Sequence, residues 1–190
     1  TIFDPSHQLG RPTLAEELLG VECVNGHPNP PDAYDCATCA GSLAAAPHML
    51  DNPPRMVVEA STGARLALRR DLVVGRAPQY LSYNEGTELL TVPSPGRLVS
   101  RSHVLLQVVG WQVSAIDMDS HNGTVLRRLG YEDVQLVPDA QVPLRYGDEL
   151  DLGDGVVLRF LPPGASTDDD AAASAHSAGE SMNATGSLTY

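Results

Sequence analysis

The chain has 190 residues, 42% of them hydrophobic, and a formal net charge of −12. That hydrophobic content is enough for one medium domain with a core of its own and smaller appendages. A net-acidic chain repels nucleic acid and anionic lipid, and the sequence contains no apolar run of about 18 residues. Composition therefore disfavours a nucleic-acid-binding protein and a protein inserted in a membrane.

Charge and composition divide the chain into segments. Residues 1–54 carry a net charge of −6, residues 55–163 carry −2, and residues 164–190 carry −4. We expect an N-terminal segment with a short helix (1–20), a small metal-binding module (21–45), a linker (46–54), a β-rich domain (55–163) and a tail too poor in apolar residues to fold alone (164–190).

A short helix is predicted at the end of the first segment. Residues 13–16, Thr-Leu-Ala-Glu, fit a helix capping box, Glu17-Leu18-Leu19 follow, and Gly20 is a stop signal. A helix of about two turns is marginal in water unless it packs on another element. We expect it to dock on the rest of the protein, and a short partner-binding helix is the alternative.

Three cysteines and one histidine form the candidate metal site: Cys23, His27, Cys36 and Cys39. Zinc prefers four tetrahedral nitrogen or sulfur ligands, and the short spacing within each pair lets both halves wrap one ion. The stretch resembles the small zinc ribbon attached to signalling modules in actinobacterial proteins. Four protein ligands leave no open coordination position, so the expected zinc is structural; the alternative is a set of reduced cysteines with an incidental histidine.

Cysteine usage also bears on location. Three cysteines cannot all pair with one another, and metal ligation suits a reducing compartment better than disulfides do. No secretory signal is visible at the start of the sequence. We therefore expect a cytoplasmic protein.

Many short apolar runs separated by turn residues follow from Arg55 onward. The predicted strands are 56–60, 65–68, 72–74, 104–109, 111–116, 124–127, 134–137, 149–152 and 156–161. No segment of helical period in this region exceeds a turn or two. This pattern indicates a mainly β domain built as an antiparallel β-sandwich.

Small polar and basic residues gather between these runs, in three short motifs. They are Gly75-Arg76, Ser100-Arg101-Ser102-His103 and Ser120-His121-Asn122-Gly123. The strands at 104–109 and 111–116 form an expected hairpin, which brings the second and third motifs to one end of a sheet. Hydroxyl, guanidinium and amide groups gathered on loops in this way suit an anionic ligand such as phosphate.

The order of these motifs, with Val142-Pro143-Leu144 and Tyr146-Gly147-Asp148-Glu149-Leu150 after them, resembles that of a forkhead-associated (FHA) domain. The resemblance extends from Arg55 to Pro163. It implies a β-sandwich of about eleven strands whose loops at one end bind phosphothreonine in a partner protein.

The resemblance also assigns roles to single residues. Arg76 is expected to reach the phosphate or the peptide backbone, Ser100 and Arg101 to donate to the phosphate, Ser120 to add a phosphate contact, and Asn122 to bond the peptide main chain. The structural positions are Gly75, His103 and Gly123. The segment 77–99 is longer than the connection usual in the family, and it could carry an extra hairpin, extend the peptide surface or displace Arg76.

The function expected from these features is that of a non-enzymatic adaptor. The sequence has no nucleophile elbow, no P-loop and no open zinc motif. The adaptor is expected to act downstream of a Ser/Thr kinase. Its expected partner is a threonine-phosphorylated protein or the kinase itself, or the chain's own tail if Thr167, Thr185 or Thr189 is phosphorylated. The alternative is an FHA-fold scaffold that binds partners without phosphate.

Overall fold

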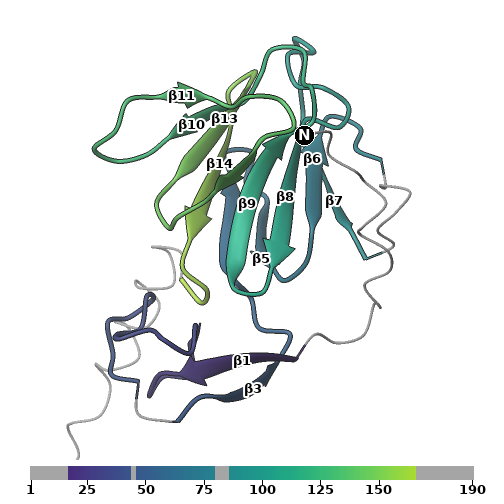
Figure 1. Ribbon diagram of the computed structural model, residues 1–190. Coiled ribbons are helices and arrows are strands. Elements are labelled where there is room, and N and C mark those ends of the chain that lie inside the picture. The colour runs from purple at the N-terminus through teal and green to yellow at the C-terminus, as the bar shows by residue number, and fades with distance from the viewer. Residues whose placement is uncertain (1–16, 44–45, 80–85, 166–190) are drawn as a thin grey trace, which may run out of the picture.

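Two β-sheets packed face to face form the larger part of the molecule (Figure 1). The computed structural model describes residues 17–43, 46–79 and 86–165. One sheet has six strands in the order β11 (Val134–Gln135), β10 (Val125–Arg127), β13 (Glu149–Gly153), β14 (Val156–Leu161), β4 (Met56–Ala60) and β5 (Arg65–Leu68). The other has five in the order β12 (Gln141–Pro143), β9 (Gln112–Asp117), β8 (Val104–Val109), β6 (Leu72–Gly75) and β7 (Glu88–Thr91). The predicted mainly β sandwich is confirmed.

The core lies between the two sheets. Side chains alternate between the faces of a strand, so every second residue can point inward. Leu106, Leu150, Leu158 and Phe160 are fully buried in one continuous cluster that both sheets supply. Burying an aliphatic or aromatic side chain of this size contributes roughly 1.5–3 kcal/mol. The packed core thus fixes the strands from which the loops at both ends of the sandwich extend.

The long segment between Arg76 and Ser100 contains the edge strand β7. Leu72 to Gly75 of β6 pair in parallel with Glu88 to Thr91 of β7, whereas the other pairs described in the two sheets are antiparallel. A parallel pair needs a crossover connection and cannot be a hairpin. The segment therefore adds one parallel edge strand to a sandwich whose other described strand pairs are antiparallel, as expected.

A separate three-stranded sheet precedes the sandwich, with the order β2 (Pro28–Asn29), β1 (Glu17–Glu22) and β3 (His48–Asp51). The helix predicted up to Gly20 is wrong over residues 17–20, which belong to β1, and its capping box lies outside the described residues. Leu18 pairs with Leu50, and Leu19 with Met49. This long-range pairing outweighs the weak preference of a two-turn segment for helix.

The predicted linker at 46–54 also requires correction, because four of its residues form β3. Leu50 is buried against β1, so the segment has an apolar anchor that a linker lacks. Of its three prolines, Pro47 lies directly before the strand, and Pro53 and Pro54 lie after it. The sandwich begins directly beyond them at β4.

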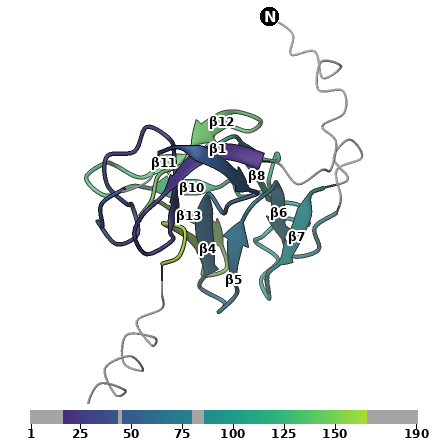
Figure 2. The same cartoon turned by 90° about the horizontal axis from the view of Figure 1, so that it is seen from below.

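The three-stranded sheet packs against one end of the sandwich, as the view from below shows (Figure 2). The Trp111 indole Nε1–H donates to the Leu19 carbonyl oxygen at 2.7 Å. A Cβ on Gly20 would lie 2.6 Å from Trp111 Cζ2, so the ring rests on bare backbone. Thr38 also donates to the Pro163 carbonyl oxygen.

A buried arginine braces the same end of the sandwich. Arg55 is 1% exposed and donates to the carbonyl oxygens of Gly110, Pro53 and Arg69 and to Asn52 Oδ1. These bonds tie the approach to β4 to two turns of the sandwich. Across the described ranges, no helix has the length and apolarity that a membrane span requires.

Candidate functional sites

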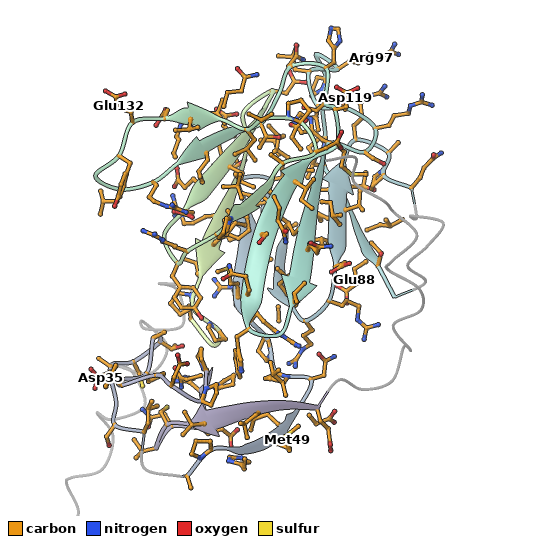
Figure 3. All side chains as sticks on the ribbon, in the orientation of Figure 1. Asp35, Met49, Glu88, Arg97, Asp119 and Glu132 are labelled. Atoms are coloured by element: carbon orange, nitrogen blue, oxygen red, sulfur yellow. The ribbon has the colours of Figure 1, made fainter. Side chains whose placement is uncertain are left out.

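Three loops meet at the end of the sandwich opposite the small sheet. They follow β6, connect β7 to β8, and connect β9 to β10. In Figure 3, Arg97 and Asp119 mark this end, while Asp35 and Met49 mark the other. The Arg76 amide donates to the Ser100 carbonyl oxygen at 3.0 Å, and the His121 amide donates to Ser100 Oγ at 3.0 Å. Ser100 therefore joins all three loops.

Gly75 allows the first two loops to touch. A Cβ at this position would lie 1.9 Å from the Arg101 carbonyl oxygen and 2.9 Å from that of Ser100. No side chain fits at these distances. The sequence motif Gly75-Arg76 thus sets the approach of the β6 end to the Ser100-Arg101 backbone.

The two serine hydroxyls at this end have different partners. Ser100 Oγ accepts a hydrogen bond from the His121 amide, so its own proton can be donated to a ligand. Ser120 Oγ lies 2.7 Å from Asp117 Oδ2 and donates to that buried carboxylate. Of the two hydroxyls, Ser100 is the better placed to donate to an anion.

His103 links the second and third loops from inside. Its Nδ1 accepts the Ser100 amide N–H at 3.0 Å, and its Nε2 lies 3.2 Å from the Gly123 carbonyl oxygen. The first bond needs an unprotonated Nδ1, so the ring is neutral with its proton on Nε2. Burial lowers the pKa of His103 below its ordinary value of 6.5, although the Gly123 bond and the charge of Asp117 oppose the shift.

Asn122 and Gly123 complete the third loop. Asn122 is exposed, and its Nδ2 donates to the Leu98 carbonyl oxygen at 2.8 Å. That bond uses one of the two N–H donors of the amide, which leaves its oxygen and second N–H for a ligand. Gly123 has a φ of 78°, and a Cβ there would lie 2.2 Å from Gln135 Nε2.

Asp117 is a site residue that the sequence motifs do not include. It is fully buried and accepts hydrogen bonds from the Ser120 amide, the Ser120 hydroxyl and the Thr124 hydroxyl at 2.8, 2.7 and 2.6 Å. The available signal was its place at the end of a strand, three residues before one hydroxyl and seven before another. It fixes the shape of the third loop.

Unpaired positive charge gathers at the loop end. Among the arginines that the structure describes, seven side chains have a hydrogen-bond or ion-pair partner: Arg55, Arg65, Arg69, Arg70, Arg127, Arg128 and Arg159. The other four, Arg76, Arg97, Arg101 and Arg145, are exposed and have none within the described ranges. Three of these four belong to the loops around Ser100. Their guanidinium groups are available for an anion from outside.

The four predicted metal ligands come together at the opposite end of the molecule. All four ligand atoms lie within 4.8 Å of one another. Cys23 Sγ is 3.8 Å from Cys39 Sγ, and His27 Nδ1 is 3.5 Å from Cys23 Sγ and 3.6 Å from Cys36 Sγ. A tetrahedral zinc ion requires about 3.8 Å between two sulfurs and about 3.6 Å between sulfur and nitrogen. The donor set fits that ion.

Polar groups stabilise the thiolate form of Cys36 and Cys39, whereas burial raises the pKa of Cys23 above its ordinary 9.0 despite two backbone hydrogen bonds to its sulfur. The Asn25 and His27 amides donate to Cys23 Sγ at 3.3 and 3.4 Å. Burial raises the pKa of the Cys36 thiol, but the opposing hydrogen bonds, led by those of the Cys39 and Thr38 backbone, lower it to about 6 from its ordinary 9.0. A thiolate is the form that binds a metal.

Asn29 joins the two halves of the cluster, although no sequence motif indicated this role. It is 1% exposed, its Nδ2 donates to the His27 carbonyl oxygen at 2.8 Å, and its Oδ1 accepts the Ala37 amide at 3.0 Å. The amide thus spans the His27 turn and the segment between Cys36 and Cys39. Second partners of this kind orient the ligands of a metal site.

One protein-family model matches part of the sandwich. Residues 72–153 match the family model for the FHA domain. The match runs from the first residue of β6 to the last of β13, so it includes the three loops and excludes the cysteine cluster. No curated protein matches the chain.

Several solved structures resemble the chain. The FhaA FHA domain complexed with the intracellular domain of Rv3910 is 23% identical, with a TM-score of 0.40 over 55% of this chain and 98% of that one. The FHA domain of human APLF in complex with an XRCC1 bisphospho peptide is 25% identical, with a TM-score of 0.44 over 56% and 96%. The MEK1 FHA domain in complex with the HOP1 pThr318 peptide is 20% identical, with a TM-score of 0.42 over 57% and 97%.

Proposed function

We propose that the loop end of the sandwich binds a threonine-phosphorylated peptide. The observation that carries the proposal is the Ser100 hydroxyl, whose proton is available on adjoining loops that also carry the unpaired arginines Arg76 and Arg101. A phosphate dianion offers several strong acceptors, and charge-assisted hydrogen bonds from arginine and hydroxyl groups suit it. Asn122 then bonds the peptide main chain, and Ser120 adds a weaker contact because its proton is held by Asp117.

Recognition of this kind makes the protein an adaptor and not a catalyst. FHA domains are recognition modules, and the matched region contains the loops that the proposal uses. The phosphate on the partner comes from a Ser/Thr kinase, and the reduced cysteine cluster suits a cytoplasmic location. The tail threonines proposed as internal ligands lie outside the described residues.

Peptide titration tests this proposal. The probes are three degenerate peptide libraries that differ only in a central phosphothreonine, phosphoserine or unmodified threonine. We expect binding of the phosphothreonine library alone to be strong, and Ser100→Ala and Arg101→Ala to weaken it about tenfold or more.

Arg145→Ala is the matched control, because Arg145 is also exposed and unpaired in the described ranges but lies outside the three loops. It should bind as the wild type does. Equal, weak binding of all three libraries would contradict the proposal and favour the phosphate-independent scaffold.

We further propose that Cys23, His27, Cys36 and Cys39 hold one structural zinc ion. The support is the ligand spacing: one sulfur–sulfur distance of 3.8 Å and two sulfur–nitrogen distances of 3.5 and 3.6 Å match those of a tetrahedral site with three sulfurs and one nitrogen. With four protein ligands the ion supplies crosslinking and no open position for a substrate.

Metal analysis of the purified protein should give one zinc per chain. His27→Ala should lose the zinc, whereas His48→Ala should retain it, because His48 lies on β3 beside Glu22 and outside the cluster. Well under one zinc per wild-type chain, or equal loss from both variants, would contradict the assignment.

A further inference from the structure

The turn between β13 and β14 reaches across to the loop that carries Ser100. Asp154 Oδ2 accepts the Leu98 amide N–H at 3.1 Å and also the Ser94 hydroxyl. Ser94 Oγ in turn accepts the Val99 amide at 3.0 Å. One carboxylate thereby holds, directly or through Ser94, two consecutive amides that immediately precede Ser100.

The backbone at this contact has a non-glycine residue in a left-handed turn, and the neighbouring loop packs on its carboxylate. Asp154 has a φ of 55°, a left-handed conformation that favours glycine and costs other residues roughly 1 kcal/mol. Its neighbours Gly153 and Gly155 are glycines with φ of 90° and 73°. A Cβ on Gly96 would lie 2.5 Å from Asp154 Oδ1, so the loop packs its bare backbone on the carboxylate.

The contact continues into the candidate phosphopeptide site. The same residue whose amide is held by Asp154, Leu98, has its carbonyl oxygen held by Asn122 Nδ2 at 2.8 Å. Both peptide groups of Leu98 are therefore fixed by side chains. Asn122 and Ser100 are the two polar residues proposed to meet the peptide main chain and the phosphate.

We propose that Asp154 is a positioning residue for phosphopeptide binding. It acts through Leu98 and Ser94, and holds Ser100 and Asn122 in their binding arrangement before the peptide arrives. A loop that is already ordered loses less conformational entropy on binding, which raises affinity without adding a contact. This inference rests on the proposed phosphopeptide function.

Glycine and asparagine substitutions at this position separate the carboxylate from the backbone. Asp154→Gly keeps the left-handed turn and removes both acceptors, whereas Asp154→Asn keeps one side-chain oxygen for the same two bonds. The matched control is Asp139→Gly, an exposed aspartate with a φ of 59° in the turn before β12. The probe is the tightest-binding peptide selected from the phosphothreonine library.

We expect Asp154→Gly to bind this peptide about tenfold more weakly, Asp154→Asn to stay within about threefold of the wild type, and Asp139→Gly to be unchanged. Amide NMR spectra of the unliganded Asp154→Gly variant should shift or broaden at Leu98, Val99 and Ser100, with the sandwich strands unchanged. Ser94→Ala, which leaves the turn intact, should weaken binding in the same direction.

Wild-type affinity in both Asp154→Gly and Ser94→Ala would overturn the inference and leave the proposed function standing. An equal loss in Asp139→Gly would also overturn it, because removal of any nearby charge would then suffice. Absence of phosphate-dependent binding by the wild-type chain would overturn the proposed function and this inference together.

Discussion

The two ends of the molecule hold polar side chains in different ways. At the loop end, Ser100 joins three loops by hydrogen bonds, while a neutral histidine links the second and third and a buried aspartate holds the third. At the other end, three cysteines and one histidine converge in a module that has few buried apolar residues of its own. The first arrangement is supported by the sandwich core, and the second gathers a donor set that could hold a metal ion.

Charge separates the two ends as well. Residues 17–51 contain five acidic residues and no arginine, while three unpaired arginines lie at the loop end. A surface that binds an anionic ligand needs exposed charged groups that are held in place without an internal ion-pair partner. A structural metal site needs all of its ligands bound to the ion. We therefore expect that a substitution that disrupts one end leaves the structure and binding of the other end intact.

Removing the metal should have the largest effect. Cys36→Ser, or chelation of the wild type, removes an interaction that contributes on the order of 10 kcal/mol in small structural zinc sites. We expect NMR signals of residues 17–43 to collapse to unfolded positions, while the sandwich signals and phosphopeptide affinity change by less than about threefold. A collapse of affinity would show that the two ends are coupled through Trp111.

Alanine at two close-packed glycines should have the next largest effects. Gly75→Ala forces a Cβ against the Arg101 carbonyl and should destabilise the fold by about 1–3 kcal/mol and weaken phosphopeptide binding about 100-fold, because Ser100 and Arg101 move together. Gly20→Ala places a Cβ against Trp111 at the other end.

The second variant is the control for the first. Both are measured by urea unfolding and by peptide titration. Gly20→Ala should lower stability with little change in affinity. A similar loss of affinity in both variants would contradict the independence of the two ends.

The sandwich strands could be predicted because their signal is local. The ranges 56–60, 65–68, 104–109 and 156–161 were expected from apolar runs bounded by turn residues, and each is a strand with those bounds. β7 has no buried leucine or valine to mark it and is held by pairing with β6. The first residues of β1 were predicted to end a helix that begins at the capping box, but they pair with β3 instead. Non-local pairing decided both misses.

The site was predictable only in part for the same reason. The motifs around Ser100 and Asn122 are readable in sequence because short loops carry them. The state of each hydroxyl proton depends on which group folds against it, and Asp154 meets Leu98 across 56 residues of chain. Asp117 and Asn29 are buried polar residues whose partners lie on other turns. No short sequence pattern predicts such long-range contacts.

The two serines at the loop end should differ in their effect on binding. Ser100→Ala removes a hydroxyl whose proton is available, so phosphopeptide affinity should fall roughly 10- to 100-fold. Ser120→Ala removes a bond to Asp117, and should lower stability by about 1 kcal/mol while affinity changes by less than about fivefold. Titration and urea unfolding measure the two effects. The reverse order would show that Ser120 turns its hydroxyl to the phosphate.

The smallest expected effect is a pH dependence at His103. Because burial lowers its pKa in the folded state, the unfolded chain takes up a proton near pH 6.5 and the folded chain only at lower pH. Its contribution to stability is thus fully present above pH 6.5 and is lost as pH falls from there through the folded pKa. Protonation also places a proton on Nδ1, which then cannot accept the Ser100 amide.

Urea unfolding between pH 7 and pH 5 measures this dependence. His103→Gln is the comparison, because the difference between the two proteins isolates the contribution of His103. Stability is the appropriate quantity, because the second ionisation of a phosphopeptide, near pH 6, would confound an affinity measurement. The wild type should lose more stability than His103→Gln over this range. Parallel curves would mean that His103 titrates alike in the folded and unfolded chains, and the neutral imidazole bridge between Ser100 and Gly123 would have to be abandoned.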